Sequence, residues 1–273
     1  MLELIDWTTF TVLLAAGFLG SQAVAPLNQS IQKLTQGDAK TVPGSRSQRM
    51  IGFLNAGINL VVIAIAIIGG LLFTALLKTV GVPLVESALT GSPAPSLWAT
   101  VAVPIMAGLS LGVVLSLSAL YRPNDRHVDF YSISIWRRLL AGVLHGGIVE
   151  ELVFRWFLLS FIVWLLSLFS GFAGDATPNN AFWIANTIAA LLFGLMHVPG
   201  SAATGPLTGI TIFLVMALNT LVGLVYGYLF WQHGLEAAVF AHMSTHLALQ
   251  PCATLLLRVV SSRRSMPPIP KEI

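Results

Sequence analysis

Charged residues are scarce in this chain of 273 residues. Asp, Glu, Lys and Arg make up only 9% of it, against about 25% in a typical soluble domain. Hydrophobic residues make up 56% of the chain, and the mean hydropathy is +0.83. Such a composition leaves too little polar surface for a soluble domain and favours a lipid environment.

Cysteine is scarcer still, since Cys252 is the single one. One cysteine excludes a disulfide framework within the chain and a cysteine-based zinc site. The first seven residues contain Glu3 and Asp6 but no Lys or Arg, whereas a secretory signal begins with a basic region. We therefore expect the first apolar run to be a retained membrane span.

Seven apolar runs are long enough for membrane-spanning helices, which need roughly 20 residues each. They are 6–27, 51–77, 98–120, 139–169, 181–198, 207–231 and 235–257. The predicted fold is all-α, a polytopic membrane helix bundle of about seven transmembrane helices. We divide the chain into three N-terminal spans (1–130), a four-span core that would carry the site (131–257) and a basic tail (258–273).

The distribution of basic residues supports this count. All those expected on one side of the membrane lie in the first loop, the third loop or the tail: Lys33, Lys40, Arg46, Arg49, Arg122, Arg126, Arg137, Arg138, Arg258, Arg263, Arg264 and Lys271. Only Lys78 falls on the other side. Because basic loops stay in the cytoplasm, we expect a multi-pass protein of the cell (plasma) membrane with its N-terminus outside and its C-terminus cytoplasmic. An eighth span would break the alternation unless it is short or re-entrant.

Ionisable residues interrupt the fourth, fifth and seventh apolar runs. They are Glu150, Glu151, Arg155, His197, His242 and His246. Each such side chain inside a span costs at least about 2.5–3.5 kcal/mol on insertion scales. We therefore expect these residues to face the interior of the bundle and to satisfy one another.

Helical spacing sorts these residues. Glu151 and Arg155 are four residues apart with the acid first, which favours an ion pair on one helix face. Glu150 lies about 100° further round the helix, so it can point elsewhere, towards a cavity. His242 and His246 are also four residues apart and present two imidazoles on one stripe. We predict a structural pair, Glu151 with Arg155, beside a working set of Glu150, His197 and His242, which His246 joins by geometry.

Three glycines lie close in sequence to these ionisable residues. Gly146 and Gly147 precede the two acids and Gly194 precedes His197, and small residues allow membrane helices to approach closely. His145 and His233 lie near expected interfaces, and we assign them no role.

These residue types suit hydrolysis by an activated water. A carboxylate can act as general base, a neutral imidazole can hold the water, and a second pair of donors can stabilise an oxyanion. Two alternatives use the same residues differently. One is a membrane transporter or proton relay, because intramembrane Glu and His also mark ion paths, and the other is a non-catalytic immunity or scaffold protein.

Three ordered motifs resemble those of the CPBP family of intramembrane proteases, which includes the type II CAAX prenyl endopeptidases and bacteriocin-processing or abortive-infection-like relatives. The motifs are Glu150-Glu151-x-x-x-Arg155, Phe193-x-x-x-His197 and Gly234-Leu235-x-x-Ala238-x-x-x-His242. The resemblance covers roughly residues 130–250 and implies an endopeptidase that cuts a peptide bond near the membrane, with CAAX-type processing of prenylated proteins as one form. The partners it implies are the lipid bilayer and a membrane-associated peptide or lipidated protein, with no nucleic acid.

The resemblance also assigns roles to individual residues. Glu150 would be the general base, and His197 would help to hold and polarise the water. Glu151 and Arg155 would orient the site, while His242 and the residue four positions later would form the oxyanion pocket.

The chain departs from the family at that last position, where it has His246 in place of the usual Asn. An imidazole can also donate a hydrogen bond to an oxyanion, so the departure does not exclude activity. Our first hypothesis needs no cofactor. As an alternative, Glu150, His197, His242 and His246 could ligate a divalent metal such as zinc, which accepts His and carboxylate ligands.

Overall fold

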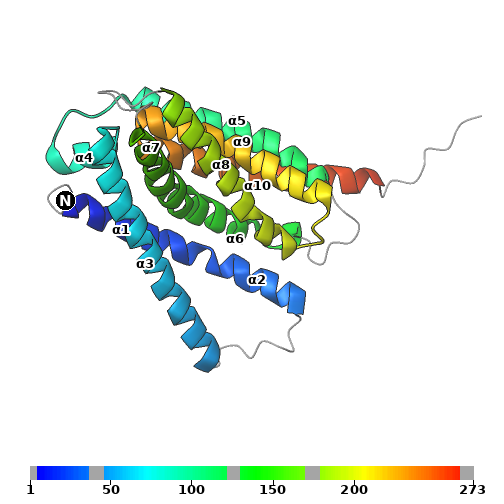
Figure 1. Ribbon diagram of the computed structural model, residues 1–273. Helices are drawn as coiled ribbons and strands as arrows, with labels where there is room; N and C mark the ends of the chain where they lie inside the picture. The colour runs from blue at the N-terminus through cyan, green and yellow to red at the C-terminus, as the bar shows by residue number, and fades with distance from the viewer. Residues whose placement is uncertain (1–4, 37–45, 122–129, 170–178, 265–273) are drawn as a thin grey trace, which may run out of the picture.

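A computed structural model describes residues 5–36, 46–121, 130–169 and 179–264, and the regular structure in these ranges is helical throughout (Figure 1). Within the described ranges, seven long helical rods and the short helices α4 (Pro83–Thr90) and η5 (Phe130–Ser132) make up the bundle. The first three rods are α1 (Trp7–Ala23) with α2 (Ala25–Gln36), α3 (Arg46–Leu77), and the run η3 (Trp98–Ala102), α5 (Val103–Ser116) and η4 (Leu117–Leu120). The last three are α8 (Asn179–Ala202), α9 (Gly209–His233) and α10 (Leu235–Arg264). The predicted all-α bundle is confirmed.

The fourth rod runs from residue 135 to residue 167 through the centre of the bundle. It consists of α6 (Ile135–Leu140), the π-helices η6 (Ala141–Glu150) and η7 (Leu152–Leu159), and α7 (Ser160–Ser167). One side of it contacts α1 and α3, while the other contacts α8, α9 and α10. Every residue of the predicted site therefore lies on this rod or on a helix that packs against it.

Among the described residues, five stretches are long and apolar enough to cross a membrane, judged by length and composition. They are Trp7–Thr35, Gly52–Leu77, Trp98–Leu120, Asn180–Ala202 and Gly209–His233. The other two long rods are the central rod and α10, which carry every residue of the predicted site except His197, on α8. The short helix α4 (Pro83–Thr90) has eight residues, too few to cross the bilayer.

Several helix ends differ from the predicted span ends. α1 stops at Ala23 and α2 continues the rod to Gln36, α3 begins at Arg46, and α10 continues to Arg264 into the predicted tail. Hydropathy marks where a helix is apolar, and these helices continue through polar residues beyond that stretch. The outer tail (265–273) lies outside the described residues, as do Lys40, Arg122, Arg126 and Lys271.

The central rod also differs from the expected regular α-helix. π-Helical hydrogen bonds run from residue i to residue i+5, and such segments are rare and frequent at functional sites. The apolar run at 139–169 predicts a helix here, but hydropathy does not distinguish an α-helix from a π-helix in a segment that is apolar all round.

Glycines allow a close backbone contact between α5 and α10. A Cβ atom on Gly108 would collide with the carbonyl oxygen of Ala241, and one on Gly112 with that of Thr245. The two backbones therefore touch at the level of His242, which fixes α10 against the rest of the bundle.

A further glycine contact holds α3 against the central rod. The indole ring of Trp156 fills the space where a side chain on Gly70 would lie. Trp156 is fully buried, and its Nε1 donates a hydrogen bond to the carbonyl oxygen of Ile67 at 3.3 Å.

The predicted break near residue 234 is confirmed, because α9 ends at His233 and α10 begins at Leu235. Gly234 has a φ of +89°, a conformation that glycine adopts readily. Two residues later, Glu236 Oε1 accepts hydrogen bonds from the backbone N–H groups of Leu84 and Val85, each at 3.0 Å. Glu236 thus holds the first turn of α4 against the start of α10.

The α5–α10 contact predicts a large effect of Gly108→Leu. The new side chain has no space, so we expect the variant to lose about 1–3 kcal/mol of unfolding free energy, as overpacked cores do. Gly57→Leu is the matched control, because no atom lies within 4 Å of a Cβ there. Thermal unfolding in detergent measures both, and equal stabilities of the two variants would contradict this packing.

Candidate active site

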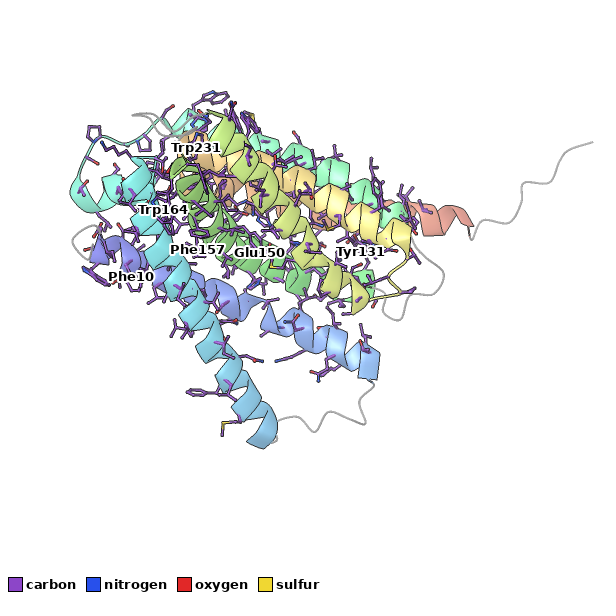
Figure 2. The ribbon with its side chains drawn as sticks, viewed as in Figure 1. Phe10, Tyr131, Glu150, Phe157, Trp164 and Trp231 are labelled. Atoms are coloured by element: carbon purple, nitrogen blue, oxygen red, sulfur yellow. The ribbon has the colours of Figure 1, made fainter. Side chains whose placement is uncertain are left out.

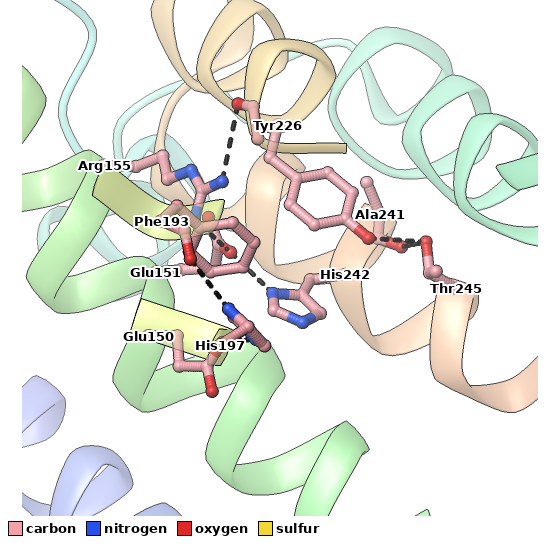
Figure 3. Close-up of polar contacts among 10 residues, drawn as sticks. Glu150, Glu151, Arg155, Phe193, His197, Tyr226, Ala241, His242 and Thr245 are labelled. Carbon is pink, nitrogen blue, oxygen red and sulfur yellow. Dashed lines mark hydrogen bonds and ion pairs between the residues drawn. The ribbon is translucent and has the colours of Figure 1, made fainter. Parts of the chain in front are cut away.

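The Glu151 carboxylate joins two of the predicted residues. Its Oε1 atom accepts a hydrogen bond from Arg155 Nη1 at 3.0 Å and another from His242 Nδ1 at 2.6 Å (Figure 3). Glu151 is 0% exposed, and both partners are also buried. The Glu151–Arg155 ion pair predicted from the spacing is confirmed, and it extends to a third group on α10.

The buried hydrogen-bonded chain of Arg155, Glu151 and His242 changes the predicted division of the site residues into a structural pair and a working set. His242 was expected to work beside Glu150, apart from the structural pair, yet its Nδ1 bonds directly to Glu151. The structure therefore adds a link between the structural pair and the working set that the sequence did not predict. The carboxylate of Glu151, on the central rod, binds Arg155 on its own rod and His242 on α10, and spacing along one helix does not reveal the second contact.

Aromatic rings surround the guanidinium group of Arg155. It lies 4.2 Å from the ring centre of Phe193 and 5.3 Å from that of Tyr226, distances at which a cation is attracted by the ring face. Arg155 Nη2 also donates to the carbonyl oxygen of Gly223 at 3.4 Å. The charge of Arg155 is thus balanced by Glu151 and enclosed by α8 and α9.

Glu150 lies in a more open environment than its neighbour. Figure 2 shows it near the middle of the bundle. Its side chain is 15% exposed and its Oε2 lies 3.7 Å from His197 Nε2, on an imidazole that is 31% exposed. His197 Nδ1 bonds to the carbonyl oxygen of Phe193 at 2.7 Å. Since a carbonyl can only accept, Nδ1 carries the proton and Nε2 is the atom turned towards Glu150.

His246 lies beside His242, as its spacing predicts. The two rings are stacked, with centroids 5.2 Å apart, and the ring of His246 lies flat against Gly142. A Cβ on Gly146 would be 3.0 Å from His242 Nε2 and 3.5 Å from His246 Nε2. The Nε2 atoms of both imidazoles therefore border the same glycine, one helical turn before Glu150.

Four histidines lie near the Glu150 carboxylate: His197, His242, His145 and His246. The predicted residues are thus brought together around one carboxylate. His145, to which the sequence assigned no role, belongs to the same neighbourhood, whereas no contact of His233 with the site is found among the described residues.

The predicted close approach at three glycines is confirmed. Gly146 faces the two imidazoles, a Cβ on Gly147 would be 2.5 Å from Met243 Cγ, and one on Gly194 would be 3.0 Å from the carbonyl oxygen of Met216. Gly146 and Gly147 therefore admit α10, and Gly194 admits α9.

Sequence reasoning missed Tyr226 on α9. Its ring stacks on His242 at 4.8 Å, and its hydroxyl donates to Thr245 Oγ1 at 2.7 Å. Thr245 in turn donates to the carbonyl oxygen of Ala241 at 2.9 Å. One signal was present, because Gly223 and Gly227 are four residues apart, a spacing typical of closely packed membrane helices, and they bracket Tyr226 in the sequence.

The alternative metal site stays a prediction. In the part of the chain that the structure describes, no group of three or more His, Cys, Asp or Glu side chains is placed to hold a metal ion. The bond between His242 Nδ1 and Glu151 leaves Nε2 as the nitrogen that could ligate, as in metal-bound histidines. The ligand set of Glu150, His197, His242 and His246 would need these side chains to move closer together.

The buried ion pair of Glu151 and Arg155 predicts strong energetic coupling between the two residues. Removing one partner of a buried ion pair costs about 3–5 kcal/mol, because the other charge is left uncompensated. We expect Glu151→Ala and Arg155→Ala each to destabilise the protein strongly, and the double variant to lose clearly less than the sum of the two. Unfolding in detergent measures the cycle, and simple additivity would contradict the ion pair.

Comparison with known proteins gives one match. Residues 132–248 match the family model described as Type II CAAX prenyl endopeptidase Rce1-like. No curated protein and no solved structure matches the chain. The matched segment contains all three motifs and the whole central rod, and it confirms the family resemblance. The segment that carries the site is therefore similar to the Rce1-like family, and with its apolar helices the chain is an integral membrane protein.

Proposed function

We propose that this protein is an intramembrane endopeptidase in which Glu150 activates a water molecule for attack on a peptide bond. The observation that carries the proposal is the part-exposed pair of Glu150 and His197 beside a fully buried chain of Arg155, Glu151 and His242. The pair can reach a substrate, and the chain holds the surrounding helices in place.

The geometry of the pair suits a shared water. At 3.7 Å the carboxylate and the imidazole are too far apart for a direct hydrogen bond, and one water molecule could bond to both groups at this separation. With Nδ1 bonded to the Phe193 carbonyl, neutral His197 offers the lone pair of Nε2 to a water proton. Glu150 Oε2 has no hydrogen-bond partner among the described residues, so it can accept the other proton as general base.

The two stacked imidazoles supply the second half of the mechanism. Attack on a carbonyl carbon places negative charge on its oxygen, and preorganised donors stabilise that charge. His242 donates Nδ1–H to Glu151, so its Nε2 can donate as well only in the imidazolium form, whose charge the developing oxyanion would balance, because Glu151 already pairs with Arg155. His246 can donate from Nε2 in its neutral form. We assign these two Nε2 atoms to the oxyanion pocket, with His246 in the place of the family's Asn.

Glu151 and Arg155 act on the reaction through His242. Because Glu151 pairs with Arg155 as a carboxylate, its Oε1 can only accept a hydrogen bond, and His242 must donate from Nδ1. This bond fixes the tautomer and the ring orientation of the His242 imidazole. Both are positioning residues in this mechanism.

The family match supports a substrate of the CAAX type, a prenylated or otherwise membrane-associated protein cut near its C-terminus. The bilayer is then the second partner. We place the protein in the plasma membrane with its C-terminus cytoplasmic. Among the described basic residues, Lys33, Arg137, Arg138 and Arg258 lie in the segments at one end of the bundle and Lys78 lies at the other, which is the bias of cytoplasmic loops.

Cleavage of prenylated and unprenylated peptides by reconstituted protein tests the proposal. We expect Glu150→Gln and His197→Ala each to lower kcat about 10²–10⁴-fold, as loss of a general base does, while thermal unfolding stays close to that of the wild type. His233→Ala is the matched control, since it removes an imidazole outside the site.

Two outcomes would overturn this assignment. Full activity of both variants would contradict the catalytic role of Glu150 and His197 and favour a scaffold protein. Solute or proton flux that is lost on the same substitutions would favour a transporter. The proposed mechanism uses no metal, so a chelator should leave kcat unchanged. A stoichiometric metal lost together with activity would make Glu150 and the histidines its ligands instead.

Tyr226 allows a separate prediction about positioning. Tyr226→Phe keeps the ring that stacks on His242, so we expect most of the activity to remain. Tyr226→Leu removes the stack, and we expect kcat to fall about tenfold or more with KM nearly unchanged, because misplacement of a catalytic group slows the chemical step. Equal kcat values in the two variants would show that the ring does not position His242.

A further inference from the structure

A second polar region lies far from Glu150, near the C-terminal end of α10. A cavity of about 390 Å³ opens there between the segment that precedes the central rod and the last turns of α10. Its lining includes Tyr131, Ser134, Arg138, Thr254, Leu255 and Arg258. Neither the family motifs nor the proposed mechanism uses these residues.

The cavity is separate from the site. Thr254 follows His246 by eight residues, about 12 Å along α10, and Arg138 precedes Glu150 by twelve residues on the central rod. The start of α10 lies at the opposite end of the bundle, where Leu235 N–H bonds to the carbonyl oxygen of Gly81. The cavity therefore lies at the end where the run 98–120 finishes and the central rod begins, which is the level of a membrane surface.

Arg138 is held rigidly in the cavity wall. Its Nη1 donates to Gln250 Oε1 at 2.8 Å, its Nη2 donates to Thr254 Oγ1 at 2.9 Å, and its Nε donates to the carbonyl oxygen of Ile133 at 3.1 Å. Arg138 is 2% exposed. The guanidinium is thus preorganised, so little side-chain freedom would be lost when an anion binds beside it.

The rest of the lining combines charge, hydroxyl groups and apolar surface. Arg258 lies one turn beyond Thr254 on the same face of α10, and Ser134 adds a hydroxyl from the opposite wall. Leu255 is 63% exposed at the cavity, and Trp136, two residues before Arg138, is 71% exposed. Exposed Trp is typical of membrane–water interfaces, so an apolar chain beside the cavity would lie in the bilayer.

We propose that this cavity binds the phosphate headgroup of an anionic phospholipid. Guanidinium groups match phosphate oxygens in geometry and charge, and basic pockets between membrane helices are a known form of headgroup site. Leu255 and Trp136 would contact the acyl chains. Under the proposed orientation, the lipid belongs to the cytoplasmic leaflet. The proposal does not depend on the protease mechanism.

Native mass spectrometry of delipidated protein, titrated with phosphatidylglycerol or phosphatidylcholine, tests this site. We expect the anionic lipid to bind with the higher affinity, and Arg258→Gln to weaken that binding about five-fold, which corresponds to about 1 kcal/mol for one basic residue. Arg258→Lys should retain most of the affinity. Lys33→Gln is the matched control, because it removes one exposed charge near the same end of the bundle.

The result that would overturn the proposal is equal binding of the two lipids, or an equal loss in Arg258→Gln and Lys33→Gln, since either would indicate attraction by net charge alone. Competition by inorganic phosphate at the concentration of the lipid would overturn the lipid assignment in favour of a free-anion site. Circular dichroism of each variant confirms that the helices are intact.

Discussion

The fold of this protein depends on the burial of one carboxylate in an apolar bundle. An isolated charge in such a place is prohibitively unfavourable, so Glu151 requires its partners, and these come from its own helix and from α10. The guanidinium of Arg155 in turn requires the rings of Phe193 and Tyr226 from α8 and α9. Four rods must therefore meet at one level, and the glycines of the bundle let them do so. The interaction that satisfies the carboxylate thus also assembles the site.

Glu150 is available to act because Arg155 and His242 both bind Oε1 of its neighbour Glu151. Glu150 points away from the buried chain and keeps partial exposure, facing His197 across a gap of 3.7 Å. Two neighbouring residues of the same type thus have different environments, one closed and one open. The π-helices on either side of Glu151 accompany this arrangement, and such segments are frequent where a helix carries functional side chains. The stacked imidazoles of His242 and His246 complete the site beside Glu150.

Much of this could be predicted from the sequence, and the failures have physical causes. The pairing of Glu151 with Arg155 follows from helical spacing, and the meeting of three helices follows from the need to satisfy ionisable groups in lipid. The partner of His242 could not be predicted, because contacts between helices depend on their rotation about their own axes. Tyr226 was missed because a Tyr in an apolar run carries no sign of what its ring covers. The short helix α4, held by Glu236, lies in a loop that hydropathy does not describe.

The proposed site depends on the protonation of two imidazoles. His197 and His242 each carry a proton on Nδ1, which His197 donates to the Phe193 carbonyl and His242 to Glu151. Solid-state ¹⁵N NMR of histidine-labelled protein in liposomes measures this directly, with His197→Gln and His242→Gln to assign the signals. We predict a protonated Nδ1 in both rings, and for His242 a change in the Nδ1 signal in Glu151→Gln. Two neutral rings protonated only on Nε2 would contradict the account, since neither hydrogen bond that organises the site could then exist.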